Sequence, residues 1–271
     1  MNLANVKLVV SDMDGTLLNS KHEVSSLFFE LFEKMKQHGI LFVPASGRPL
    51  YGILDKLASI KDDLIIVAEN GGLVVQQDEV LLSTPINNQD LKQINTLITS
   101  VNEAEVVFCT KEKAFTASKS EKLLTLLAEY YANFQLIDSI EEISEPVYKT
   151  AIYHEVSSEK YLYPHFQHLE NNYKVKVSAN HWVDISANNA NKGYAVELLQ
   201  KNFNISPEET MIFGDYNNDI EMLKTAHFSY AMENAHPLVK ETANFSTKSN
   251  NHFGVESILS LLIEAKEASR L

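Results

Sequence analysis

Residues 11–18 read SDMDGTLL and follow directly on Leu8-Val9-Val10, an apolar run with the composition of a buried strand. Ligands of open α/β sheets bind at the carboxyl ends of strands, so aspartates at this point are predicted to face a ligand crevice. Asp12 and Asp14 stand one residue apart, and the glycine that follows lets the backbone bend close to a ligand. Turns rich in Asp and Gly are common, so the prediction needs support from the rest of the chain.

The chain divides into three segments that differ in how predicted strands and helices alternate. From residue 7 to about residue 82, short apolar runs alternate with an amphipathic helix predicted over 27–35, which indicates a mostly parallel sheet covered on both faces. Between 83 and 185, helices alternate with pairs of strands, which predicts an antiparallel sheet with helices on one face. One of these helices is predicted near 161–169. After residue 185 the alternation of single strands and helices returns. We therefore place an α/β core at 1–82 plus 186–271 and an inserted α+β domain at 83–185.

Composition narrows the possible partners. The 271 residues include 36 Asp and Glu against 23 Lys and Arg, a formal net charge of −13, and the basic residues are scattered. A nucleic acid would need a clustered basic stripe, so we expect no nucleic-acid partner. The single cysteine excludes an internal disulfide and fits a reducing compartment. With no apolar stretch near the ~18 residues of a membrane span and no signal peptide, we expect a cytoplasmic protein without a membrane partner.

Two further motifs supply groups that could bind an anion. Ser46 and Gly47 follow the second predicted strand, where a hydroxyl and a backbone N–H could both donate to a phosphate oxygen. Lys192 opens the helix after the inserted segment, where its charge could face the two aspartates. Arg48 lies beside the first of these motifs, and we assign it no role.

A fourth motif, GDYNND at 214–219, follows the strand predicted at 210–213. Asp215 is placed there to bind a hard divalent cation, with Asn218 and Asp219 in support from the start of the next helix. Carboxylate and carbonyl oxygens suit Mg²⁺ rather than zinc. Four motifs thus fall at strand or helix ends on one predicted rim.

These motifs together resemble those of the haloacid dehalogenase superfamily. Residues 12–16 look like its first motif, Ser46 its second, Lys192 its third and residues 214–219 its fourth. The Cof-type branch, and within it the bacterial sugar phosphatases, is the closest match, and the likeness extends to 67–72 and to the tail from 231–235 through 254–255. The resemblance implies a Rossmann-like parallel-sheet core with an inserted cap domain of type IIB.

The resemblance also implies a mechanism in which Asp12 attacks phosphorus and forms an aspartyl-phosphate, while Asp14 acts as general acid and base. Mg²⁺ would be held by Asp12, Asp215 and the Asp14 backbone carbonyl. The phosphate would be bound by Ser46, Gly47, Lys192 and Asn218, with Asp219 in a supporting position.

The expected substrate is a small phosphorylated metabolite, with sugar phosphates first, and the expected assembly is a monomer or weak homodimer. Two alternatives remain open at this point. A sugar phosphomutase would use the same aspartates but return the phosphate to the sugar. A non-catalytic protein that binds a phosphate ligand would keep the fold without turnover.

Overall fold

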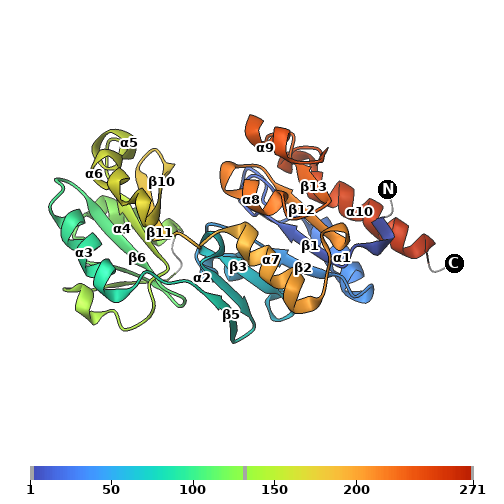
Figure 1. Cartoon of the computed structure of the whole chain (residues 1–271), viewed down its shortest axis with the longest axis horizontal. Coiled ribbons are helices and arrows are strands. Elements are labelled where there is room, and N and C mark those ends of the chain that lie inside the picture. The colour runs from blue at the N-terminus through green and yellow to red at the C-terminus, as the bar shows by residue number, and fades with distance from the viewer. Residues whose placement is uncertain (1–2, 131–132, 270–271) are drawn as a thin grey trace. The chain divides into compact units, whose positions relative to one another are not determined.

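The computed structural model describes residues 3–130 and 133–269 and contains two compact units (Figure 1). The first comprises residues 1–47, 56–81 and 191–271, and the second comprises 48–55 and 82–190. Each unit is built on a sheet of its own.

The main sheet of the first unit is parallel, in the order β14-β13-β12-β1-β2. Its strands are β1 (Leu8–Ser11), β2 (Leu41–Pro44), β12 (Thr210–Gly214), β13 (Phe228–Ala231) and β14 (Phe245–Ser246). The central strand β1 pairs with β12 and β2, which places Val10 in register with Ile212 and Val43. The prediction of a Rossmann-like parallel core is confirmed, and the carboxyl ends of β12, β1 and β2 are adjacent.

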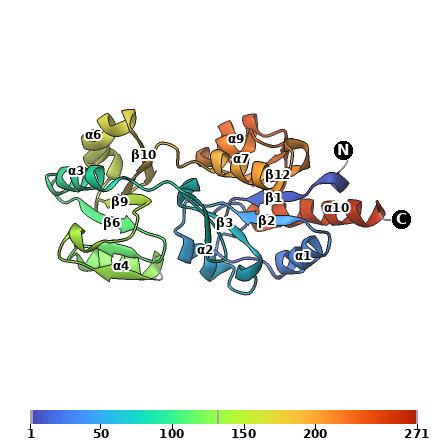
Figure 2. The same cartoon turned by 60° about the horizontal axis from the view of Figure 1, so that its bottom comes forward.

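Helices cover both faces of this sheet. In Figure 2, α7 and α9 lie on one face, and α1 and α10 lie on the other. The helices of this unit are α1 (Ser26–Gln37), α7 (Lys192–Phe203), α8 (Ile220–Leu223), α9 (Pro237–Thr242) and α10 (Gly254–Ala268), whereas all of α2 (Leu50–Lys56) except Lys56 belongs to the second unit. Helix α1 begins where the Ser25 hydroxyl accepts a hydrogen bond from the Phe28 N–H, and it buries Phe28, Phe32 and Met35 at helical spacing.

The apolar run at 64–67 lies largely in β3 (Ile65–Ala68), but most of the pairing of this strand lies outside the parallel sheet. It is antiparallel to β4 (Leu73–Gln76), and β5 (Glu79–Ser83) completes a three-stranded sheet. One parallel bridge, from Ala45 to Val67, joins β3 to the end of β2. The hairpin follows from the short connection at 69–72, which leaves no room for a crossover helix.

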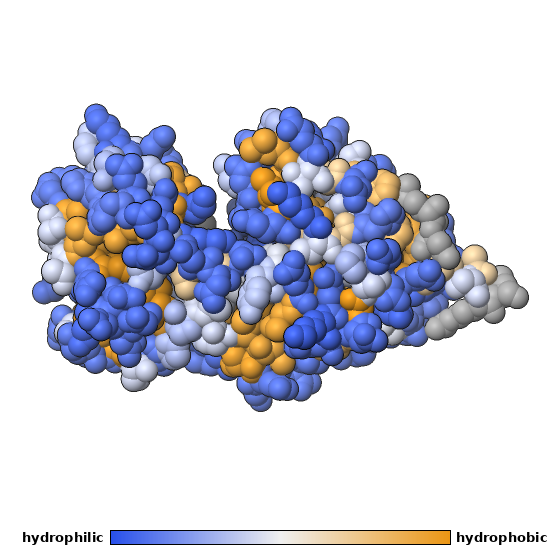
Figure 3. Space-filling view, viewed as in Figure 1, coloured by the Kyte–Doolittle hydropathy of each residue, from blue (hydrophilic) through white to orange (hydrophobic). Residues whose placement is uncertain are grey.

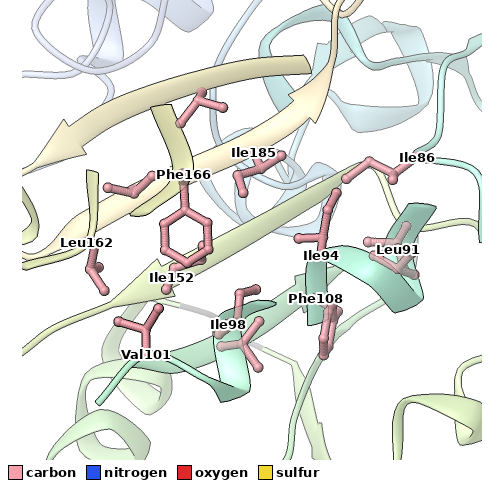
Figure 4. Packing of buried hydrophobic residues seen from close by; sticks show 14 of the residues in the cluster. Ile86, Leu91, Ile94, Ile98, Val101, Phe108, Ile152, Leu162, Phe166 and Ile185 are labelled. Carbon is pink, nitrogen blue, oxygen red and sulfur yellow. The ribbon is translucent and has the colours of Figure 1, made fainter. Parts of the chain in front are cut away.

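The second unit carries a six-stranded sheet in the order β10-β11-β9-β6-β7-β8, antiparallel except for the β7–β8 pair. Its strands are β6 (Glu105–Cys109), β7 (Ala114–Thr116), β8 (Phe134–Leu136), β9 (Lys149–Tyr153), β10 (Tyr173–Ala179) and β11 (Trp182–Ala187). Helices α3 (Asn88–Thr99) and α6 (Tyr163–Phe166) pack on one face. Figure 4 shows part of the cluster in which Ile94 and Ile98 of α3 are buried together with Ile152 of β9 and Phe166 of α6.

The expectation that all helices of this unit cover one face is wrong. Helix α4 (Glu121–Tyr130) lies on the opposite face from α3 and α6 (Figure 2). Strand β6 is buried on both sides: Phe108 belongs to the α3 core, whereas Val107 and Cys109 pack with Leu123 and Leu127 of α4. A strand that is apolar at consecutive positions requires cover on both faces.

The single helix predicted near 161–169 is also wrong. The structure has three short pieces instead: α5 (Ser158–Tyr161), α6 (Tyr163–Phe166) and a 3-10 turn (Gln167–Asn171). Pro164 has no N–H to donate to the preceding turn, and its ring disfavours a continuous helix through the residue before it. Pro164 instead occupies the first turn of α6, where a missing N–H costs nothing.

The surface is mostly hydrophilic in the view of Figure 3, with separate hydrophobic patches. Among the described residues, no helix combines the length and the apolar character that a membrane crossing requires.

Candidate active site

Asp12 lies at the carboxyl end of β1, where the chain leaves the sheet and turns. The turn is closed by hydrogen bonds from Leu17 N to Asp12 O (3.2 Å) and from Leu18 N to Met13 O (2.8 Å). Gly15 has a φ of +80°, and a Cβ at this position would lie 2.2 Å from Asp215 Oδ2. Only glycine therefore lets this turn pass so close to the Asp215 carboxylate.

A buried lysine connects two of the aspartates. Lys192 Nζ donates to Asp12 Oδ1 (2.5 Å) and to Asp219 Oδ1 (2.7 Å), and the lysine side chain has no exposed surface. The N-terminus of α7 positions this lysine, because the Asn191 side chain caps the helix by accepting from Tyr194 N (2.6 Å). An ammonium buried between two carboxylates is paired on both sides, as a buried charge must be.

Asp215 and Asp219 come from the loop after β12. Asp219 is fully buried, and its Oδ2 accepts from the backbone N–H of Asp215 (2.9 Å) and of Tyr216 (3.1 Å). Both Asp219 oxygens thus accept hydrogen bonds from protein groups, which suits a residue that shapes the loop. Asp215 Oδ1 accepts from Thr16 Oγ1 (3.2 Å), so the two loops contact each other directly.

The acidic residues of this site could hold a divalent cation. Among the described residues, Asp12, Asp215 and Asp219 each offer an oxygen ligand, and the three oxygens lie within 4.8 Å of one another. An all-oxygen donor set is the type that hard cations prefer.

Burial and the closeness of these charged groups shift the pKa values of Asp12, Asp215 and Lys192. Burial raises the pKa of Asp12 well above its ordinary value, Asp219 adds to the rise, and Lys192 opposes it. Burial also raises the pKa of Asp215, to about 6, with Asp219 again adding to the effect. Burial alone would lower the pKa of Lys192, but Asp12 and Asp219 outweigh it, and the pKa is raised. One lysine does not balance three carboxylates, and a bound cation would relieve the excess.

We expect Asp215 to make the metal-free protein less stable as the pH rises from about 4 to about 7. Its pKa is about 6 in the folded chain against an ordinary value of 3.8, so the folded state keeps the proton that the unfolded state releases. The stability linked to this proton is present below about pH 4 and is lost as the pH rises through about 6. Urea unfolding in EDTA should show the loss as a falling difference in unfolding free energy between wild type and Asp215→Asn. A difference that is constant with pH would contradict the raised pKa.

The Asp14 side chain is not one of the three carboxylates with neighbouring ligand oxygens, although its charge contributes to the raised pKa of Asp215. Its side chain is 43% exposed, and its Oδ1 lies 3.3 Å from His22 Nδ1. The carboxyl group is therefore accessible, as a group that exchanges protons with substrate and water must be. The predicted metal contact through the Asp14 backbone carbonyl stays a prediction.

Apart from Lys192, which begins α7 and pairs with the aspartates, the predicted phosphate-binding residues lie on the loops after β2 and β12. Ser46 is buried, and its backbone N–H donates to Val67 O (2.9 Å). Asn218 donates from Nδ2 to Asn70 Oδ1 (2.9 Å). The Asn70 amide also lies beside Gly47, since a Cβ at Gly47 would be 3.0 Å from Asn70 Oδ1.

Three residues with contacts in the site received no role from the sequence. Thr16 donates to Asp215, His22 lies beside Asp14, and Asn70 contacts Asn218. Thr16 and Asn70 stand within stretches that the resemblance covers, but no periodicity marks either as a contact. His22 carries no sequence signal, because an isolated histidine after a turn is ordinary.

Comparison with known proteins shows the family of the chain. The sequence matches the haloacid dehalogenase-like hydrolase family over residues 9–259. The chain belongs to this family. The 5-amino-6-(5-phospho-D-ribitylamino)uracil phosphatase of Escherichia coli is 30% identical over 267 residues, which cover 96% of this chain and 97% of the relative.

Solved structures of family members share the fold. A haloacid dehalogenase-like hydrolase from Bacteroides thetaiotaomicron has a TM-score of 0.84 at 26% identity, over 95% of this chain and 99% of that one. A subclass IIB sugar phosphatase of the superfamily has a TM-score of 0.80 at 22% identity, over 94% and 98% of the two chains. The resemblance and the IIB cap fold expected from the sequence are confirmed. As a member of this family the chain is a phosphatase of small phosphorylated substrates.

Proposed function

We propose that this chain is a Mg²⁺-dependent phosphatase that hydrolyses a sugar phosphate through a phosphorylated Asp12. The observation that carries the proposal is the buried Lys192, which holds the Asp12 carboxylate at the end of β1 beside Asp215 and Asp219. A carboxylate fixed by an ammonium, next to oxygen ligands for a cation, is suited to nucleophilic attack on an anionic phosphate.

The first step is in-line attack by an Asp12 oxygen on phosphorus. The bond between phosphorus and the ester oxygen breaks as the bond to Asp12 forms, and Asp14 gives its proton to the leaving oxygen. In the second step, Asp14 takes a proton from water, and this water attacks the phosphorus of the aspartyl-phosphate. Inorganic phosphate leaves, and Asp12 returns to the free carboxylate.

The remaining groups stabilise charge and fix positions. Lys192 pairs with Asp12 before attack and with the phosphoryl oxygens during it. The phosphoryl oxygens would also accept hydrogen bonds from Ser46, Gly47 and Asn218. Asp12, Asp215 and the Asp14 carbonyl would hold Mg²⁺, whose charge offsets the negative charge that collects around phosphorus.

A sugar phosphate is supported as substrate by two observations. The Escherichia coli relative is named for a substrate with a phosphorylated ribityl group, which is a sugar alcohol phosphate. A structural relative is described as a sugar phosphatase. We further propose that residues 83–185 form the cap domain and select the leaving group.

We expect phosphate release from p-nitrophenyl phosphate and from a panel of sugar phosphates to stop in EDTA and to return with Mg²⁺. The metal requirement follows from the three neighbouring carboxylates, whose negative charge exceeds what Lys192 alone can balance and would repel a phosphate. Activity that is indifferent to EDTA and to added Mg²⁺ would contradict the metal assignment.

The same panel of phosphate esters distinguishes a phosphatase from the two alternatives, a sugar phosphomutase and a non-catalytic phosphate-binding protein. A sugar phosphomutase would form an isomeric sugar phosphate without free inorganic phosphate, so the two products are measured side by side. A protein that only binds its ligand would be silent on every ester yet would still bind inorganic phosphate.

A further inference from the structure

The loop after β3 adopts an unusual backbone conformation. Glu69, Asn70 and Gly71 have φ values of +50°, +55° and +90°, three left-handed residues in succession. Glycine and asparagine tolerate this region, but it is unfavourable for glutamate. Such strain persists where the surroundings fix the backbone, and here Asn70 N donates to Ser46 O (2.9 Å) and Gly72 N to Glu69 O (3.0 Å).

This loop contacts three other segments of the site. Asn70 Oδ1 accepts from Asn218 Nδ2 (2.9 Å). A Cβ added to Gly47 would lie 3.0 Å from Asn70 Oδ1 and 3.1 Å from Nδ2, so the amide fills the space beside that glycine. A Cβ added to Gly71 would lie 2.2 Å from Asn191 O, at the start of the helix that carries Lys192.

A single amide therefore lies between two groups to which the proposed function gives phosphate contacts. Asn218 is exposed, and an exposed side chain samples several rotamers unless a partner holds it. Hydrogen bonding to Asn70 gives the Asn218 amide one orientation before the phosphate arrives. The contact with Gly47 fixes the loop after β2 against the same amide. Orientation before binding is what a preorganised phosphate site requires.

We propose that Asn70 is a positioning residue of the phosphate site, which holds Asn218 and the Gly47 loop in the geometry that binds the phosphoryl group. This inference rests on the proposed function. It adds a residue to which the sequence motifs gave no role and links it to Asn218 as one unit.

Asn70→Gly is the informative substitution, because glycine keeps the left-handed backbone and removes only the amide. Asn204→Gly is the matched control, since Asn204 is also left-handed (φ +51°) but lies exposed at the end of α7. Both variants should unfold at similar temperatures. Asn218→Ala and the double variant Asn70→Gly/Asn218→Ala complete the set.

Calorimetric titration with inorganic phosphate in the presence of Mg²⁺ should show about tenfold weaker binding for Asn70→Gly and unchanged binding for Asn204→Gly. The double variant should bind about as weakly as Asn70→Gly alone, because the two amides act together. The KM for the best ester should rise in parallel.

Phosphate affinity within twofold of wild type in Asn70→Gly, or additive losses in the double variant, would overturn the inference. This readout does not depend on turnover. If wild type binds phosphate but hydrolyses no ester, the proposed function fails, while weaker binding by Asn70→Gly still supports the positioning role.

Discussion

Replacing Asp12 by Asn should reduce phosphate release by on the order of 10⁴-fold or more, because the amide cannot attack phosphorus. The fold should survive. An Asn oxygen at this position can still accept the hydrogen bond from Lys192, and removing one charge reduces the repulsion from Asp215 and Asp219. Circular dichroism and thermal unfolding check the fold, and inorganic phosphate release checks the activity.

Asp62→Asn serves as the control, because Asp62 is exposed at the surface outside the site. The activity of this variant should stay at the wild-type level. Substantial turnover in Asp12→Asn would refute the nucleophile assignment. Loss of folding in Asp12→Asn would contradict the view that the Asp12 charge is unfavourable in the absence of a cation.

Replacing Lys192 by Met should damage both activity and stability. Methionine fills a similar volume but leaves the buried Asp12 and Asp219 without their shared cation. Breaking a buried pair by removing one partner costs about 3–5 kcal/mol of unfolding free energy. Activity should fall by on the order of 10³-fold, because a charge that faces the phosphoryl oxygens is lost. Urea unfolding at pH 7 and assays of phosphate release measure the two effects.

The stability deficit of Lys192→Met should shrink as the pH falls toward 5, because burial raises the pKa of Asp12 and its carboxylate can then take up a proton. Lys201→Met on the exposed side of the same helix is the matched control and should change neither property by much. A variant as stable as wild type at pH 7 would show that Lys192 does not compensate the two aspartates.

The core of the site was predictable because parallel strands bring distant motifs together. Strand β1 lies between β12 and β2, so groups placed at their carboxyl ends must be neighbours however far apart they lie in the sequence. The motif around Asp12 and the motif around Asp215 are some two hundred residues apart, yet Thr16 bonds to Asp215 directly. The alternation of apolar runs and helices predicted a mostly parallel sheet, but it did not indicate the order of the strands.

Other features of the fold and the site could not be predicted from the sequence pattern. Asn70 acts through a left-handed backbone and a contact with Asn218, and neither leaves a periodic signal in the sequence. The inserted segment has a second helical layer, which covers the other face of β6. The consecutive apolar residues of β6 require cover on both faces, but this pattern does not show which helix covers which face. Pro164 was visible, but its effect depends on whether the helix begins before it or at it.

The roles of the carboxylates depend on one chemical event, the formation of an acyl phosphate on Asp12. Rapid quenching of the enzyme during turnover, reduction with borohydride and peptide mass spectrometry test this event, because borohydride reduces an aspartyl-phosphate to homoserine. We expect homoserine at position 12 in wild type and none in Asp12→Asn. Reduction product at another aspartate, or none at all while phosphate is being released, would contradict this expectation.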